Sequence, residues 1–150
     1  MTTVIDVDEL PAKVGEHLGY SDWQTISQEQ VNRFAEATGD HQWIHVDPER
    51  AKAGPFGGPI AHGYLTLSLI PALLGQVFGV QGITMGVNYG ANKVRFPAPV
   101  PVGSALRMGL TLAAVEEVQG GVQVTLDAVL EVQDAPKPSC VAQVVYRFYR

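Results

Sequence analysis

The sequence predicts a single α+β domain. Its 150 residues suit one domain, and a composition of 46% apolar and 17% charged residues is enough for a packed core. Helix signals gather in the first half of the chain, whereas the second half carries segments rich in Val, Thr and Tyr. Helices followed by a run of strands favour an antiparallel sheet packed on helices. The domain is predicted over 1–150, with residues 1–17 as a loosely structured lead-in.

Regular structure is expected to begin with a short strand over 19–26. Ser27 then suits the N-cap of a helix over 28–38, because Gln30 follows it at the spacing of a capping box. Gly39 can end that helix, since glycine tolerates the left-handed conformation of a helix C-terminus.

A loop is predicted over 40–47. Pro48 opens a second short helix, PERAKAG, because proline fits the first helical turn, and Asp47 is its expected N-cap. A turn-rich run of Gly and Pro follows over 54–59. The next segment, 61–78, is apolar on nearly every side, which predicts a long helix that the rest of the fold covers.

The apolar segment does not have the composition of a membrane span. A span needs about 20 predominantly apolar residues, and the stretch 60–80 is interrupted by polar residues such as His62 and Thr66. Pro71 removes a backbone donor inside the helix, which predicts a kink over 67–71. The sequence therefore favours a buried helix and no contact with a membrane.

Four strands are predicted in the second half, over 83–96, 104–118, 122–132 and 140–149. Gly120-Gly121 is a hairpin signal between the second and the third. The simplest packing curves this sheet around the buried helix. Edge strands of such a sheet need partners, which favours a homodimer.

The composition indicates which binding partners and which cellular compartment to expect. The net charge of −5 and the pI near 5.2 provide no basic footprint for nucleic acid. The one cysteine, Cys140, cannot form an intramolecular disulfide, and no Cys/His metal spacing occurs; we interpret it as a small buried residue of a strand. The acidic N-terminal segment does not resemble a signal peptide, so a cytoplasmic protein is expected.

Asp40 and His45 are the main catalytic candidates because they share one short loop, GDHQWIH. A carboxylate and an imidazole held together can bind a water molecule between them, so that one takes its proton while the other orients it or returns a proton. A glycine turn after a helix and a structural histidine would explain the same pattern. The sequence does not decide which of the two side chains is the base.

His62-Gly63 opens the buried helix, where backbone N–H groups are free and a glycine lets a carbonyl approach closely. Such a donor can stabilise an enolate oxygen. Close packing of the helix on the sheet explains Gly63 equally well. Together with Asp40 and His45, this element indicates addition of water at the carbon β to a carbonyl.

The stretches FAEATGDHQWIHVDPERA and GPFGGPIAHGYLTLSLIPALLGQ, with NYGANKVRFPAPVPVGS after them, resemble the MaoC-like hydratases, the (R)-specific enoyl-CoA hydratases of the hot-dog fold. The resemblance covers roughly residues 18–149 and is greatest to short mycobacterial or actinobacterial members. It implies a hot-dog homodimer that reversibly hydrates trans-2-enoyl-CoA to (R)-3-hydroxyacyl-CoA in fatty-acid metabolism, with no metal or organic cofactor. Asp40 and His45 match the family's catalytic pair, and Gly63 matches its oxyanion-hole glycine.

The chain departs from the family at two places. Many members have Asn-Pro where this chain has Gln42-Trp43, and some have serine at the position of Pro71. Neither departure removes a proposed acid–base group.

Four residues of one predicted strand are candidate contacts of an acyl-CoA substrate. Lys93 and Arg95 are placed to meet the phosphates of coenzyme A, although an ordinary solvated strand face explains them as well. Asn88 and Tyr89 are candidates for the pocket wall. Two other functions stay open: a hot-dog acyl-CoA thioesterase, and a non-catalytic acyl-CoA-binding module.

Overall fold

The four predicted strands of the second half form most of a six-stranded antiparallel sheet in the computed structural model, which describes residues 2–150. They are β5 (Met85–Arg95), β6 (Ala105–Val118), β7 (Gly121–Val132) and β8 (Cys140–Tyr149). Two short strands, β2 (His17–Tyr20) and β3 (Gln24–Thr25), pair with β6. The order β2-β6-β7-β8-β5 leaves β5 at an edge of the sheet. The strand predicted over 19–26 is thus two strands.

The turn between β6 and β7 lies where the glycine pair predicted it. Val118 pairs with Gly121, so the loop consists of Gln119 and Gly120. Gly120 has φ 82°, which favours glycine, whereas Gly121 already belongs to β7. The hairpin fixes the register of both strands, because a slip of one residue would turn every apolar side chain to the solvent face.

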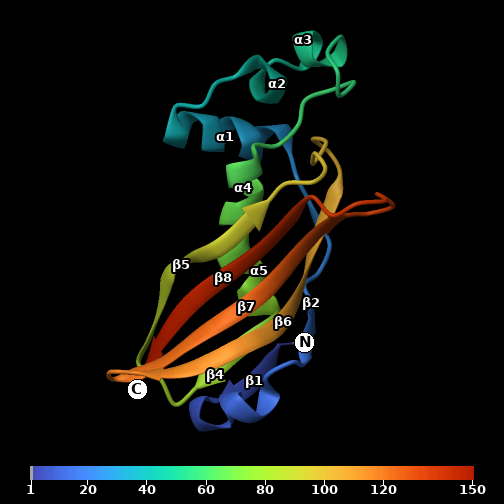
Figure 1. Ribbon diagram of the computed structural model, residues 1–150. Helices are drawn as coiled ribbons and strands as arrows, with labels where there is room; N and C mark the ends of the chain where they lie inside the picture. Colours follow the sequence, from blue (N-terminus) through green and yellow to red (C-terminus); the bar gives the residue numbers. More distant parts are fainter. Residues whose placement is uncertain (1) are drawn as a thin grey trace.

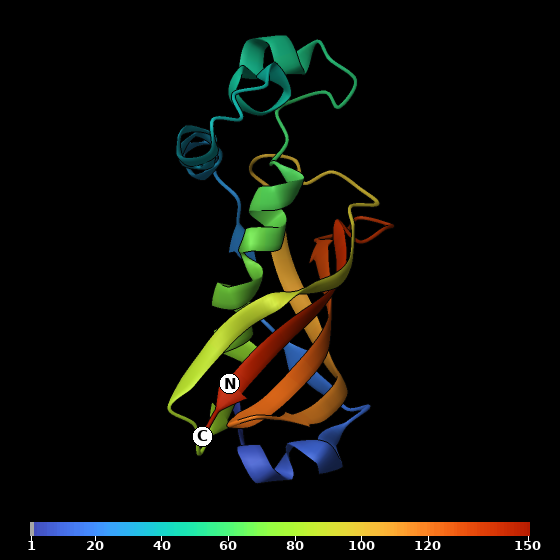
Figure 2. The ribbon, with the colours of Figure 1, turned by 60° about the vertical axis from the view of Figure 1, so that its left-hand side comes forward.

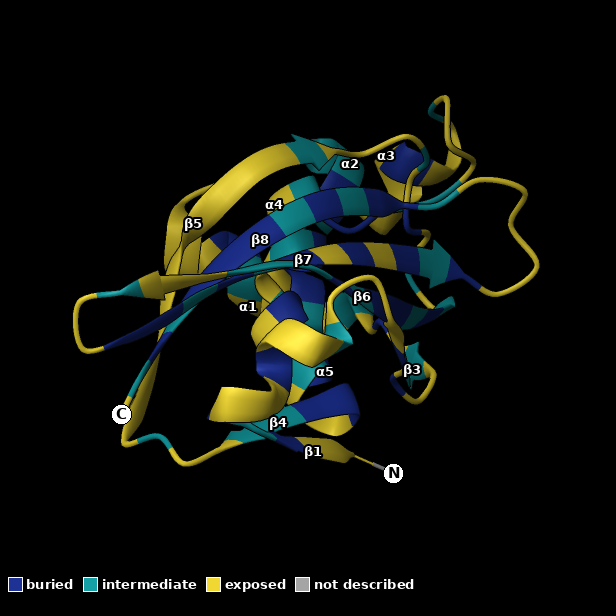
Figure 3. Ribbon diagram, turned by 60° about the horizontal axis from the view of Figure 1, so that its bottom comes forward, coloured by how far each residue is buried: buried dark blue, intermediate teal, exposed yellow. Residues whose placement is uncertain are grey.

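Alternate side chains of the sheet form the core with the apolar helix. The alternation is clearest on β7, where Val124, Leu126 and Leu130 are fully buried and Asp127 and Val129 between them are exposed. In Figure 3 the buried stretches of β7 and β8 face the central helices, whereas β5 is exposed along nearly its whole length. Burial of this apolar face is the main favourable term in folding.

The apolar segment forms two consecutive helices, α4 (Gly63–Ser68) and α5 (Ile70–Val77), which lie along one face of the curved sheet (Figures 1 and 2). The predicted kink is confirmed as an interruption at Leu69, just before Pro71. Pro71 occupies the first turn of α5, where its missing N–H costs little. The chain then continues directly into β4 (Phe78–Gln81).

The prediction of a loosely structured lead-in over residues 1–17 was wrong. Residues Thr3–Asp6 form β1, which pairs in parallel with β4, and Val7–Lys13 form a 3₁₀ helix. Leu10 is fully buried and Ile5 nearly so. Because the partner strand lies far along the chain, the local sequence gave no sign of this pairing.

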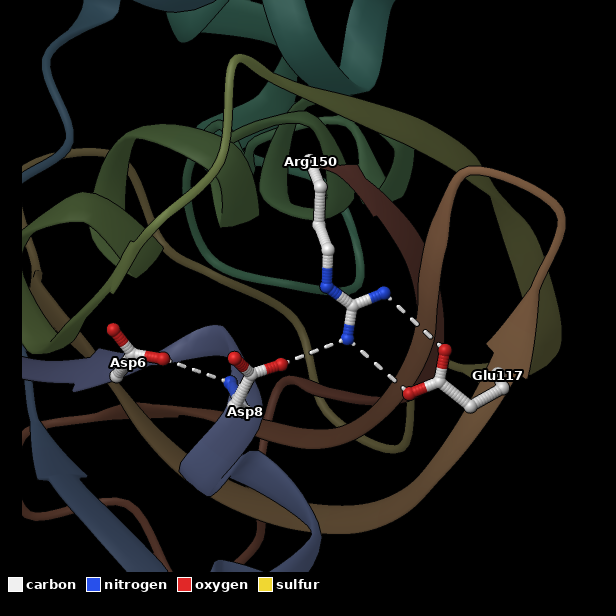
Figure 4. Close-up of polar contacts among 4 residues, drawn as sticks. All are labelled: Asp6, Asp8, Glu117 and Arg150. Carbon is white, nitrogen blue, oxygen red and sulfur yellow. Dashed lines mark hydrogen bonds and ion pairs between the residues drawn. The ribbon is translucent and has the colours of Figure 1, made fainter.

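Ion pairs hold the same N-terminal segment against the end of the chain. The guanidinium of Arg150 lies 3.0 Å from the carboxylate of Asp8 and 3.3 Å from that of Glu117, at the β6–β7 hairpin (Figure 4). The Asp6 carboxylate accepts a hydrogen bond from the Asp8 N–H. All these groups are exposed or partly exposed, so the network adds little to stability compared with the core.

Three short helices lie beyond the first residues of α4 (Figure 1): α1 (Gln28–Thr38), α2 (Trp43–Val46) and α3 (Pro48–Lys52). Helices α1 and α3 have the expected starts. The stretch predicted as a loop over 40–47 contains α2, a single helical turn. Within residues 2–150, no helix combines the length and the apolar character that crossing a bilayer requires.

Candidate active site

Helix α1 is capped at both ends, and its C-terminal cap directly precedes Asp40. The Ser27 hydroxyl accepts a hydrogen bond of 3.1 Å from the Gln30 N–H at the start of the helix. At the other end Gly39 has φ 83° and donates its N–H to the Ala35 carbonyl. The chain reverses there, and the next residue, Asp40, begins the segment that leads to α2.

Asp40 stands at the solvent side of the site. Its residue is exposed, and its carboxylate accepts a hydrogen bond of 3.3 Å from the Gln42 N–H. This local turn, typical of Asp after a helix, fixes one carboxylate oxygen and leaves the other free.

His45 lies on α2 and is turned inward, with only 6% of its surface exposed. Its ring Nδ1 lies 2.7 Å from the Ile60 carbonyl oxygen. Because a carbonyl oxygen can only accept, Nδ1 carries the proton and Nε2 of the neutral ring is an unprotonated acceptor. The Ile60 N–H bonds in turn to the Ile44 carbonyl, so two hydrogen bonds fix this segment.

The surroundings keep His45 neutral. Burial lowers the pKa of its imidazole below 6.5, and the neighbouring His62 lowers it further. The hydrogen bond to Ile60 and the charge of Asp40 oppose this shift without reversing it. A neutral imidazole with a free Nε2 is what a general base requires.

Asp40 and His45 are close enough to share a water molecule. One carboxylate oxygen of Asp40, one ring nitrogen of His45 and one ring nitrogen of His62 all lie within 4.8 Å of one another. Two hydrogen bonds of about 2.8 Å that meet at one water oxygen span such a distance. The two side chains that were predicted to form a pair therefore lie close together.

Gly63, the first residue of α4, faces the same site. Its N–H makes no hydrogen bond within residues 2–150. A Cβ at this position would lie 3.0 Å from the Phe96 ring, so a larger residue would press on that ring and the close packing favours glycine. Both interpretations of Gly63 therefore have a structural basis: a free donor and a tight contact.

A cavity of about 360 Å³ lies beside His45 and Gly63. His45 and Gly63 lie in its wall, whereas Asp40 lies outside it. Most of the wall is apolar, as is usual for small-molecule sites. The rest of the wall comes from residues that were not predicted as site residues: Phe56, Ile60, Ala61, Thr66, Phe96, Pro97, Ala98, Pro99, Val100 and Ser139.

Comparison with known proteins decides the family. The model of the MaoC like domain matches residues 9–133. The chain belongs to the MaoC-like family. It is 56% identical over 149 residues to 3-hydroxyacyl-thioester dehydratase Z of Mycobacterium tuberculosis, and the match covers 99% of both chains.

Solved structures agree with the MaoC-like assignment and with the predicted hot-dog fold. The (R)-hydratase from A. caviae involved in PHA biosynthesis matches with a TM-score of 0.73 and 26% identity, over 89% of this chain and 94% of that one. The monoamine oxidase regulatory protein from Archaeoglobus fulgius has a TM-score of 0.81 at 22% identity, over 100% and 98% of the two chains, and supports the fold alone.

The four predicted substrate contacts of this MaoC-like chain do not line the cavity of His45. Asn88 lies in a second cavity of about 280 Å³, between the α4–α5 junction and strands β5 and β8. Tyr89 is 58% exposed, and the guanidinium carbon of Arg147 lies 3.8 Å from the centre of its ring. Lys93 and Arg95 are exposed on β5. Within one chain the structure does not bring these residues to the site.

A metal ion does not fit the cluster of Asp40, His45 and His62. The two imidazole rings are stacked, with centroids 3.9 Å apart and planes inclined by only 24°. A metal ion lies in the plane of each ligating imidazole, at about 2.0–2.1 Å from nitrogen for zinc. Nearly parallel planes at this spacing meet much farther away, so no single position suits both rings.

Cys140 lies where its sequence context predicted, fully buried in β8. Burial raises the pKa of its thiol to about 11, so the thiol stays protonated near neutral pH. A buried, protonated thiol is not a nucleophile, so Cys140 is not a candidate catalytic residue.

Proposed function

We propose that the chain reversibly hydrates trans-2-enoyl-CoA to (R)-3-hydroxyacyl-CoA in fatty-acid metabolism, as a lyase without a cofactor. The observation that carries the proposal is the approach of Asp40 and His45 to within 4.8 Å beside a cavity that also holds the free Gly63 N–H. The relative that is 56% identical has a name that states the same chemistry, 3-hydroxyacyl-thioester dehydratase.

In the hydration direction, a water molecule between Asp40 and His45 is the nucleophile. Asp40 accepts a hydrogen bond from one of its O–H groups and orients it. His45 Nε2, the free acceptor, takes the other proton as the water oxygen bonds to the β-carbon of the enoyl thioester. His45 is thus assigned as the base and Asp40 as the orienting group.

Bond formation at the β-carbon pushes the electrons of the double bond towards the thioester, which becomes an enolate. The Gly63 N–H donates to the enolate oxygen, where negative charge develops. The His45 imidazolium then returns its proton to the α-carbon, which restores the thioester and the neutral base. Atoms and charge balance, and no further reactant is required.

Four residues of β5 are proposed to contact the substrate away from the reacting carbons: Asn88, Tyr89, Lys93 and Arg95. Lys93 and Arg95 are exposed cations that suit the phosphates of coenzyme A. Asn88 and Tyr89 are proposed to contact the remaining length of the substrate. Because none of the four lies in the cavity of His45, these contacts require a second chain beside β5.

The deciding experiment follows crotonyl-CoA in two ways. Hydration removes the ultraviolet absorbance of the conjugated enoyl thioester and releases no thiol, whereas hydrolysis releases free CoA that Ellman's reagent detects. We expect loss of absorbance without thiol, and dehydration of (R)- but not (S)-3-hydroxybutyryl-CoA in the reverse direction. Thiol release would instead establish the thioesterase, and binding without turnover of any enoyl-CoA would establish the binding module.

We also propose that two copies associate through β5. Among the described residues 2–150 this strand pairs only with β8, so its other edge carries unpaired backbone groups there. Met85, Val87 and Tyr89 expose apolar surface along the strand. Unprotected edges of this kind usually recruit another strand. A second copy would cover the edge and bring its own β5 next to this one.

Val87→Lys tests this association, because a lysine on an edge strand opposes strand pairing. Val129→Lys is the matched control: Val87 is 38% exposed and Val129 39%, but Val129 lies on the interior strand β7. Sedimentation velocity should show a dimer for the wild type and the control, with dissociation at least about tenfold easier for Val87→Lys. A monomeric wild type, or equal weakening in both variants, would exclude β5 as the interface.

A cytoplasmic location suits the proposal. The thiol of Cys140 is free, as is usual in reducing compartments.

A further inference from the structure

His62 is a buried side chain to which the proposed mechanism gives no role. It precedes α4 as the N-cap residue, but its side chain makes no capping hydrogen bond. Only 2% of its surface is exposed. The ring lies between His45, at 3.9 Å between centroids, and Phe34, at 4.9 Å.

The imidazole of His62 touches both members of the proposed catalytic pair. Its Nε2 lies 3.0 Å from the main-chain carbonyl oxygen of Asp40, and its face stacks on the His45 ring. No side chain of the described residues makes a hydrogen bond to the Asp40 carboxylate. His62 is therefore a physical link between the exposed turn of Asp40 and the buried ring of His45.

The hydrogen bonds of His62 fix its tautomer. The Asp40 carbonyl can only accept, so Nε2 carries the proton. The other nitrogen, Nδ1, is buried and has no partner in the described chain. The hydrogen bond to Asp40 is therefore the one polar contact that orients this ring within residues 2–150.

We propose that His62 is a positioning residue, whose ring holds the Asp40 turn and the His45 imidazole at the separation one shared water requires. The inference rests on the proposed hydration. The stacking contact, with 3.9 Å between the ring centroids, limits the movement of the His45 ring away from the Asp40 turn.

Two replacements separate the hydrogen bond from the packing. His62→Phe keeps an aromatic ring between Phe34 and His45 but has no N–H for Asp40. His62→Gln loses the ring but can place its amide nitrogen near the position of Nε2. We expect His62→Phe to lower kcat for crotonyl-CoA by about 10–100-fold with KM unchanged, because small displacements of reacting groups are costly.

The rescue by glutamine is the decisive comparison. His62→Gln should recover most of the kcat that His62→Phe loses, while His17→Phe, on the distant strand β2, should leave kcat unchanged. Wild-type kcat in His62→Phe would overturn the proposal. Equal losses of kcat in both variants, with equal drops in Tm, would reduce His62 to a packing residue.

Nuclear magnetic resonance tests the contact without substrate. The chain has only four histidines, so ¹⁵N labelling of their rings gives a simple spectrum. His62 should show the Nε2–H tautomer, and the ¹³C shift of the Asp40 carbonyl should move in His62→Phe and return in His62→Gln. The other tautomer, or an Asp40 carbonyl shift that does not change in His62→Phe, would overturn the proposal even if the wild type hydrated no enoyl thioester, a result that would separately refute the proposed function.

Discussion

Replacement of His45 by asparagine is expected to lower kcat for crotonyl-CoA hydration by roughly 10²–10⁴-fold, the usual contribution of a general base. The asparagine amide can occupy the place of Nδ1 and keep the hydrogen bond to the Ile60 carbonyl. The fold and the Tm should therefore change little. What is lost is Nε2, the acceptor to which the mechanism assigns the water proton.

His45→Gln is the companion variant. Its amide nitrogen falls near Nε2 and can still contact the water, but an amide does not take a proton at neutral pH. Equal losses of kcat in both variants would therefore mean that proton transfer is the role of His45. A near-wild-type rate for His45→Gln would mean that the ring only orients the water, and the base would have to be Asp40.

The pH profile gives an independent test of the same assignment. Burial lowers the pKa of His45 below 6.5, so the neutral base persists as the pH falls through 6.5. The profile of kcat/KM should decline only below that value, as the ring becomes protonated in the free enzyme. Asp40→Asn should lower kcat but keep this acid limb, whereas His45→Asn should remove it. An acid limb that persists in His45→Asn would belong to another group.

The elements that the sequence predicted are those whose cause is local. Helix α1 begins after Ser27, whose hydroxyl accepts a hydrogen bond from the N–H three residues later, and it ends at the left-handed Gly39. Both effects act within one turn of helix. Pro71 and the turn at Gly120 acted in the same way. The pairing of Asp40 with His45 was also local, since five residues separate them along the chain.

The features that the sequence did not reveal depend on distant contacts. Strand β1 exists because β4 passes beside it, and Leu10 is buried beneath a sheet that forms from the other end of the chain. The wall of the cavity includes Ser139 and the Phe96 turn, which lie far apart along the chain, so only the fold shows that they meet. His62 was visible beside Gly63, but only the fold shows that its ring lies against His45.

The largest effect expected outside the acid–base pair is that of Gly63→Pro, which deletes the proposed oxyanion donor without changing any side-chain charge. Proline suits the first position of a helix, and the preceding residue, His62, already has the extended conformation that proline requires, with φ −60° and ψ 139°. The backbone of α4 should therefore tolerate the change. Loss of one oxyanion-hole donor typically lowers kcat by about 10²–10³-fold.

Gly63→Ala is the matched control, because Gly63 is also in tight contact with Phe96. Both variants place a Cβ about 3.0 Å from that ring, so both disturb the packing, but only alanine keeps the N–H. The ratio of their kcat values on crotonyl-CoA therefore isolates the donor from the contact, provided that both retain the Tm of the wild type. If proline and alanine cost the same, the glycine serves packing alone, and the charge of the enolate must be stabilised from elsewhere in the cavity. A ratio near the expected loss would instead locate the developing charge at the first turn of α4, within reach of a proton returned by His45.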